Sequence, residues 1–141
     1  MPWPLTPTPP PIGFLGWLLA LYGEWDQGLA ILKKAMELNP HFPAWFHLAP
    51  FVYFYSQERY EEAYQEAQQF HLPRLFWDPL LRAATLSRLG KEPEAAQAAA
   101  ELLQLRPDFS TCGRFLISCF IKFDYLRDAI IDGLRQAGLS L

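Results

Sequence analysis

The chain has 141 residues, of which 51% are hydrophobic and 16% aromatic, while only 19% carry a charge. This composition excludes a disordered chain, and a net charge of −3 with no run of Lys or Arg excludes the basic footprint of a nucleic-acid binder. A surface with few charges and many aromatic residues predicts exposed aromatic area of the kind that binds partners.

A proline-rich leader opens the sequence, with six prolines between residues 2 and 11. Because proline removes a backbone donor and resists the helix interior, we expect residues 1–11 to be extended rather than helical. We interpret this leader as the truncated or replaced start of a longer helical array. The functional alternative is a polyproline ligand for an aromatic groove.

The first predicted helix covers residues 12–22, which are almost entirely apolar. This stretch lacks a basic flank and is shorter than the roughly 20 residues that cross a bilayer, so we predict neither a signal peptide nor a membrane segment. Gly23 then supplies a turn, and a second helix is expected over 26–38. Its apolar residues follow the spacing of one buried face: Leu29, Leu32, Ala35 and Met36.

The next pair of predicted helices is dense in aromatic residues. Residues 42–55 are expected to form a helix that is kinked near Phe46, because Pro50 frees the carbonyl one turn back at a cost of about 3 kcal/mol. The partner helix is expected over 59–70, where the following sequence, with Pro73, ends it.

A third pair begins at Asp78, which is expected to cap a helix that starts at Pro79 and stops at Gly90. Pro93 opens its alanine-rich partner, which continues to about residue 105.

Two further helices are expected over 110–120 and 125–137, capped by Asp108 and Asp124. Cys112 and Cys119 would then lie roughly 10 Å apart, too far for a disulfide. We expect both to be buried thiols in a reducing cytoplasm.

The helix pairs follow a repeat. Pro40 and Pro107 each end a pair and are 67 residues apart, close to two periods of a helix-turn-helix repeat of about 34 residues. Residues 23–30 align without a gap on residues 90–97. A degenerate middle copy, around 58–64, is expected to hold one extra residue in its turn.

These residues give the chain a resemblance to the tetratricopeptide repeat family over roughly residues 12–109. The resemblance implies an all-α fold, a right-handed α-solenoid of about three repeats over 12–42, 43–75 and 76–109, with capping helices over 110–141. The residues that align with the family's motif positions are Leu15, Gly16, Gly28, Leu32, Ala35, Pro40, Leu86, Gly90, Ala95, Ala99 and Pro107. At three of these positions the residue type differs, because Gly28 stands where the family prefers alanine and Leu32 and Ala99 stand where it prefers aromatic residues.

The stretch from Phe76 to Leu139 is also similar to the repeat tails that follow bacterial class III adenylate/guanylate cyclase domains and related winged-helix regulators. This second resemblance implies an alternative identity. The chain would be the truncated tail of a bacterial signalling protein, adenylate cyclase or transcriptional regulator, and it would act in self-association.

No pattern predicts catalysis. His41, His47 and His71 have no Cys, Asp or Glu at metal-ligand spacing, and neither a phosphate loop nor a nucleophile elbow is present. Glu61, Glu62 and Glu66 are expected to form a solvated helix face. We therefore expect a protein that is not an enzyme and that has no metal or cofactor.

Stacked helix pairs offer a concave groove lined by the first helix of each pair. We expect this groove to bind an apolar or helical segment of a protein partner in the cytoplasm, although the same aromatic residues could equally fill the core. Only Arg88 among the predicted groove residues carries a positive charge, whereas the family's best-known mode clamps a C-terminal carboxylate with Lys, Arg and Asn. The predicted groove residues are Trp17, Leu21, His47, Phe51, Phe54, Tyr55, Leu80, Ala84, Ser87 and Arg88.

Two alternatives stay open at this point. If the middle copy is one residue out of phase, its groove residues become Trp45, Leu48 and Val52. The chain could also form a homo-oligomer through an exposed face of its first helix, made by Trp17, Leu18 and Leu21.

Overall fold

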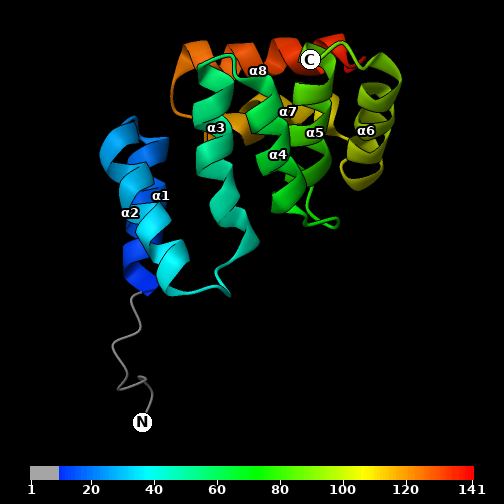
Figure 1. Cartoon of the computed structure of the whole chain (residues 1–141). Coiled ribbons are helices and arrows are strands. Elements are labelled where there is room, and N and C mark those ends of the chain that lie inside the picture. The colour runs from blue at the N-terminus through cyan, green and yellow to red at the C-terminus, as the bar shows by residue number, and fades with distance from the viewer. Residues whose placement is uncertain (1–9) are drawn as a thin grey trace.

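The computed structural model describes residues 10–141, and helix is the only regular structure in this part of the chain (Figure 1). The all-α class is therefore confirmed. The predicted leader lies outside the described residues except at its end. The elements are α1 (Pro10–Leu21), α2 (Trp25–Leu38), η1 (Ala44–His47), α3 (Leu48–Ser56), α4 (Tyr60–Phe70), α5 (Trp77–Arg88), α6 (Glu92–Leu105), α7 (Phe109–Ser118) and α8 (Asp124–Gln136).

Helix α1 begins earlier than predicted, because Pro10 and Pro11 belong to it rather than to the leader. Proline is tolerated in the first turn of a helix, where its missing N–H would have no partner within the helix. The expectation of an extended backbone was thus wrong for these two residues.

Six helices pack in sequence-adjacent pairs, α1 with α2, α3 with α4 and α5 with α6 (Figure 1). A turn of the same geometry joins the two helices of each pair. Gly23, Glu58 and Gly90 adopt positive φ angles of 99°, 59° and 77°. In each turn, the N–H of the residue after the left-handed one donates a hydrogen bond to a carbonyl in the last turn of the preceding helix. The pairs are Glu24 to Leu19, Arg59 to Phe54 and Lys91 to Leu86.

The middle turn, Gln57–Arg59, therefore has the length of the other two, and the predicted extra residue is absent. Glu58 occupies the left-handed position that glycine takes in the neighbouring turns. Trp17, Val52 and Ala84 precede Gly23, Glu58 and Gly90 by the same number of residues. The middle copy therefore matches the out-of-phase alternative, in which Val52 is the groove residue.

Small residues allow the paired helices to approach closely. Gly28, Ala63 and Ala95 hold the same place after their turns, and all three are buried. A Cβ atom on Gly16 would lie 2.7 Å from the backbone nitrogen of Leu32, and one on Gly28 would clash with the backbone of α1. The contact between α1 and α2 thus depends on glycine at both positions, and at Gly28 the family resemblance implies alanine instead.

The predicted kinked helix over 42–55 is two elements. A turn of 3-10 helix, η1, precedes α3, and Pro50 sits in the first turn of α3 instead of a helix interior. Because the α-helix starts only at Leu48, the missing N–H of Pro50 interrupts no established run of helical hydrogen bonds.

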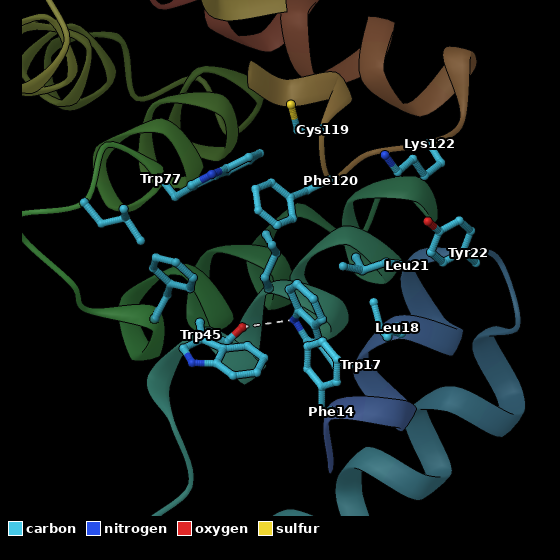
Figure 2. Close-up of a pocket in the computed structure, with 13 residues that line it drawn as sticks. Phe14, Trp17, Leu18, Leu21, Tyr22, Trp45, Trp77, Cys119, Phe120 and Lys122 are labelled. Carbon is cyan, nitrogen blue, oxygen red and sulfur yellow. Dashed lines mark hydrogen bonds between the residues drawn. The ribbon is translucent and has the colours of Figure 1, made fainter. Parts of the chain in front are cut away.

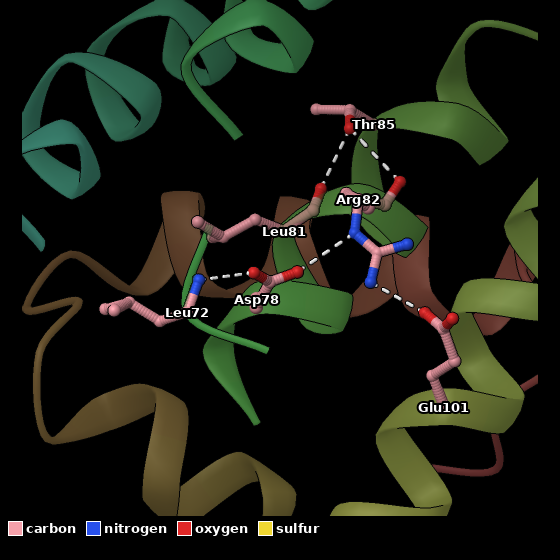
Figure 3. A network of polar contacts seen from close by, with 6 residues as sticks. All are labelled: Leu72, Asp78, Leu81, Arg82, Thr85 and Glu101. Atoms are coloured by element: carbon pink, nitrogen blue, oxygen red, sulfur yellow. Dashed lines mark hydrogen bonds and ion pairs between the residues drawn. The ribbon is translucent and has the colours of Figure 1, made fainter. Parts of the chain in front are cut away.

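Helix α5 lies at the centre of the fold, where it packs against α4, α6 and α8. Asp78 does not cap it as predicted, since α5 already starts at Trp77. The buried Asp78 carboxylate instead accepts a hydrogen bond from Leu72 N–H (2.6 Å) and pairs with Arg82 Nε (3.0 Å), and Arg82 also reaches Glu101 Oε2 in α6 (2.6 Å; Figure 3). This network fixes the loop before α5 and ties α5 to α6.

The two C-terminal helices differ from the paired ones. Helix α8 crosses over the ends of α3 and α5 instead of running beside them (Figure 1). The cysteines of this region are not buried as expected: Cys112 is half-buried and Cys119 exposed. The buried stripe of α7 is Phe109, Gly113 and Ile117, so Cys112 lies beside it and Cys119 beyond the helix end.

Matched substitutions at two turns test the shared turn geometry. Gly90→Ala should lower the free energy of unfolding by about 1 kcal/mol, because no atom crowds the position but a side chain strains the positive φ. Glu58→Gly should raise it by about 0.5 kcal/mol, since it removes that strain. Urea unfolding measures both. Changes of the same sign in the two variants would contradict the assignment.

Candidate functional site: an aromatic pocket

An open pocket of about 490 Å³ lies between α1, α3, α5 and the connection from α7 to α8 (Figure 2). Its volume falls within the range of small-ligand and side-chain pockets. The side chains around it are aromatic or aliphatic apart from Cys119 and Lys122. The lining residues are Phe14, Trp17, Leu18, Leu21, Tyr22, Trp45, Leu48, Phe70, Leu75, Trp77, Cys119, Phe120 and Lys122.

Three tryptophans and a phenylalanine set the shape of the pocket. Trp17 Nε1 donates to the backbone oxygen of Trp45 (3.2 Å), and the two rings meet edge to face with centroids 4.9 Å apart. Phe120 lies between α1 and α5, its ring centroid 6.1 Å from that of Trp17 and 5.7 Å from that of Trp77. The indole of Trp17 is thereby fixed in orientation, and Phe120 links the two walls.

Two of these residues, Trp45 and Trp77, occupy equivalent sequence positions in their helix pairs. Trp45 and Trp77 precede the left-handed residues Glu58 and Gly90 by the same distance in sequence, and both line the pocket, Trp45 from η1 and Trp77 from the start of α5. Phe120 comes instead from the connection after α7.

This connection is held against the turn between α1 and α2. A Cβ atom on Gly23 would collide with the ring of Phe123, so the two segments touch where only glycine fits. Because Phe120 and Lys122 belong to the same short segment, this contact brings them to the rim of the pocket (Figure 2).

Helix α8 covers the neighbouring part of the surface formed by α3 and α5. The Tyr55 hydroxyl lies 3.3 Å from the backbone oxygen of Ala84 and 3.2 Å from that of Ala129. Ser87 Oγ donates to the backbone oxygen of Gly133 (2.6 Å), and Arg88 Nη2 donates to that of Ala129 (2.9 Å). Backbone carbonyls of α8 thus accept hydrogen bonds from Tyr55, Ser87 and Arg88 at the ends of α3 and α5.

The absence of a side chain at Gly133 allows α8 to lie this close to α3 and α5. A Cβ atom on Gly133 would overlap the Tyr55 hydroxyl and lie 2.9 Å from the backbone oxygen of Ala84. Burial in this packed contact raises the pKa of Tyr55 from 10.0 to about 12, although the Arg88 guanidinium at 3.3 Å opposes the shift. The Tyr55 phenol therefore keeps its proton at every physiological pH.

The predicted groove residues divide into three groups. Trp17 and Leu21 line the pocket, as do Trp45 and Leu48 of the out-of-phase set. A second group, Tyr55, Ala84, Ser87 and Arg88, contacts α8. The third group, which lies away from the pocket, is His47, Phe51, Phe54, Leu80 and, from the out-of-phase set, Val52.

Two residues of the third group have specific partners. His47 Nδ1 lies 2.6 Å from Glu66 Oε2 of α4, so Glu66 is not simply part of a solvated face as expected. The ring of Phe54 lies under the guanidinium of Arg59, 4.8 Å away.

The face of the first helix that was expected to be exposed is mostly covered, because Trp17 and Leu21 are buried and Leu18 is half-buried, all three beside the pocket. Sequence reasoning missed Trp77 and Phe120. The alignment of Trp45 with Trp77 on the turn residues could have found the first. No local pattern points to Phe120, whose place depends on the packing of Phe123 against Gly23.

No helix within the described residues is long and apolar enough to span a membrane. Residues 10–141 also contain no cluster of three His, Cys, Asp or Glu side chains that could hold a metal ion. No protein-family model matches the sequence, and no curated protein matches it either.

The contact of Tyr55 with α8 predicts a specific pH dependence. Because the pKa of about 12 lies above the ordinary value of 10.0, the native state keeps a proton that the unfolded chain loses, and Tyr55 loses its stabilising contribution as the pH rises through this range. Between about pH 9 and about pH 11.5, this effect should lower the free energy of unfolding by about 2 kcal/mol. Urea unfolding at about pH 9 and about pH 11.5 should show a steeper decline for the parent than for Tyr55→Phe. Equal declines would contradict the assignment.

Proposed function

We propose that this protein is a non-catalytic interaction module that binds an apolar segment of a partner protein in the aromatic pocket. The observation that carries the proposal is the pocket itself, an opening lined almost entirely by aromatic and aliphatic side chains. Aromatic side chains with restricted rotamers are the usual anchors of protein interfaces.

Exposure at the rim supports binding of a partner over a purely structural role. Phe120 is 40% exposed and Tyr22 is 61% exposed, and both border the pocket. Covering such side chains would release water from apolar surface and favour association.

A tetratricopeptide-like solenoid is part of the same proposal. Its support is the shared turn at Gly23, Glu58 and Gly90 and the buried small residue that follows each turn. In such an arrangement the pocket lies on the face lined by α1, α3 and α5, while α8 covers the adjoining part of that face. Binding would therefore use a compact pocket and not an extended groove.

Aromatic truncations at the rim test the proposal. Peptides selected from a displayed random library on the parent protein should bind Phe120→Ala and Tyr22→Ala about 10-fold more weakly, because each variant removes a side chain that the ligand covers. Binding is measured by isothermal titration calorimetry with the synthetic peptides.

The chain offers matched controls. Phe115 is 69% exposed and Tyr125 is 62% exposed, and neither lines the pocket. Phe115→Ala and Tyr125→Ala should therefore bind the same peptides as the parent does. Equal losses in rim and control variants, or a library from which no peptide is enriched, would overturn the proposal.

A further inference from the structure

We infer that the bound segment carries an acidic side chain next to its apolar anchor, and that this carboxylate pairs with Lys122 at the rim of the pocket. The inference rests on the proposed function and adds the charge of the partner to it. It depends on Lys122, Tyr22 and the electrostatic character of the lining.

Among the described residues that line the pocket, Lys122 is the only charged one, so the lining contains no Asp or Glu. The ion pairs formed within residues 10–141 do not include Lys122. Within the described residues, its ammonium group makes one hydrogen bond, a long one from Nζ to the backbone oxygen of Ser118 (3.4 Å). The ammonium group is therefore available to an anion from outside.

The surroundings of Lys122 favour an anion over other polar groups. Lys122 and Tyr22 lie near each other at one side of the opening, with apolar side chains below them (Figure 2). A carboxylate at this place would meet a positive charge and would remain partly hydrated, so its desolvation cost would be small. A basic side chain at the same place would be repelled by Lys122.

We assign the carboxylate to a side chain and not to the end of a chain. Both rim residues are exposed, so a bound segment can continue past Lys122 into solvent. One lysine also offers a single point charge, without the several donors that would enclose a terminal carboxylate.

A charge-swap selection tests this inference. Displayed peptides enriched on the full-length parent chain should contain Asp or Glu beside their apolar residues, whereas selection on Lys122→Glu should enrich Lys or Arg at that place. Lys91→Glu is the matched control, because Lys91 is an exposed lysine outside the pocket. This control should reproduce the parent's acidic preference.

Synthetic peptides then identify the source of the charge. Lys122→Glu should weaken binding of an acidic parent-selected peptide by about three- to tenfold, as expected for an exposed ion pair replaced by a repulsion. Changing the peptide's Glu to Gln should weaken binding to the parent, and amidation of its C-terminus should not. A loss caused by amidation alone would overturn the assignment to a side chain.

The outcomes separate the two proposals. Enriched apolar peptides that need Phe120 but show no acidic preference, or keep one on Lys122→Glu, would overturn the inference and leave the proposed function intact. Enrichment that needs neither Phe120 nor Tyr22 would overturn both. A concentration-dependent mass in sedimentation, abolished by Phe120→Ala, would assign the pocket to a second copy of this chain and also count against the acidic partner.

Discussion

The close approach of α8 to the ends of α3 and α5 is the constraint on which the rest of the structure depends. At Gly133 the backbone of α8 comes so near Tyr55 and Ala84 that any side chain would collide with them. Ser87 and Arg88 then bond the carbonyls of α8, and the Tyr55 hydroxyl is buried between the helices. A single glycine thus allows hydrogen bonds that would otherwise need water, and the last helix becomes part of the core.

This packing also defines the candidate site. With α8 across one part of the surface formed by the first helices of the pairs, the pocket lies on the neighbouring part, where Phe120 packs against Trp17 and Trp77. The segment between α7 and α8 closes that opening on one side, because Phe123 packs against Gly23. The same chain segment therefore completes the core and supplies the rim residues Phe120 and Lys122. A mutation in α8 that loosens the segment would change the pocket without touching it.

The sequence predicted the local structure well and the long-range structure poorly. Glycine at 23 and 90 and the helical stripes located the turns and helices within a few residues, since both depend on neighbours in the chain. Glu58 gave no sign of its left-handed backbone, so the sequence left the phase of the middle pair open between two settings, and the structure matches the one given as the alternative. The site was found only in part, at Trp17 and Leu21 and, in the out-of-phase set, at Trp45 and Leu48. Phe120 was missed because its place depends on the packing of Phe123 against Gly23, two distant segments that no periodic pattern relates.

Amide hydrogen exchange in Gly133→Ala tests most directly whether α8 holds the pocket in shape, with the neighbouring exposed Asp132→Ala as control. Because the added Cβ would collide with Tyr55 and Ala84, exchange should accelerate about 10-fold or more over 119–136 in Gly133→Ala, while the α1–α2 pair keeps its protection. Asp132→Ala should exchange as the parent does. Unchanged protection over 119–136 in Gly133→Ala would contradict the account, and so would an equal acceleration in every helix.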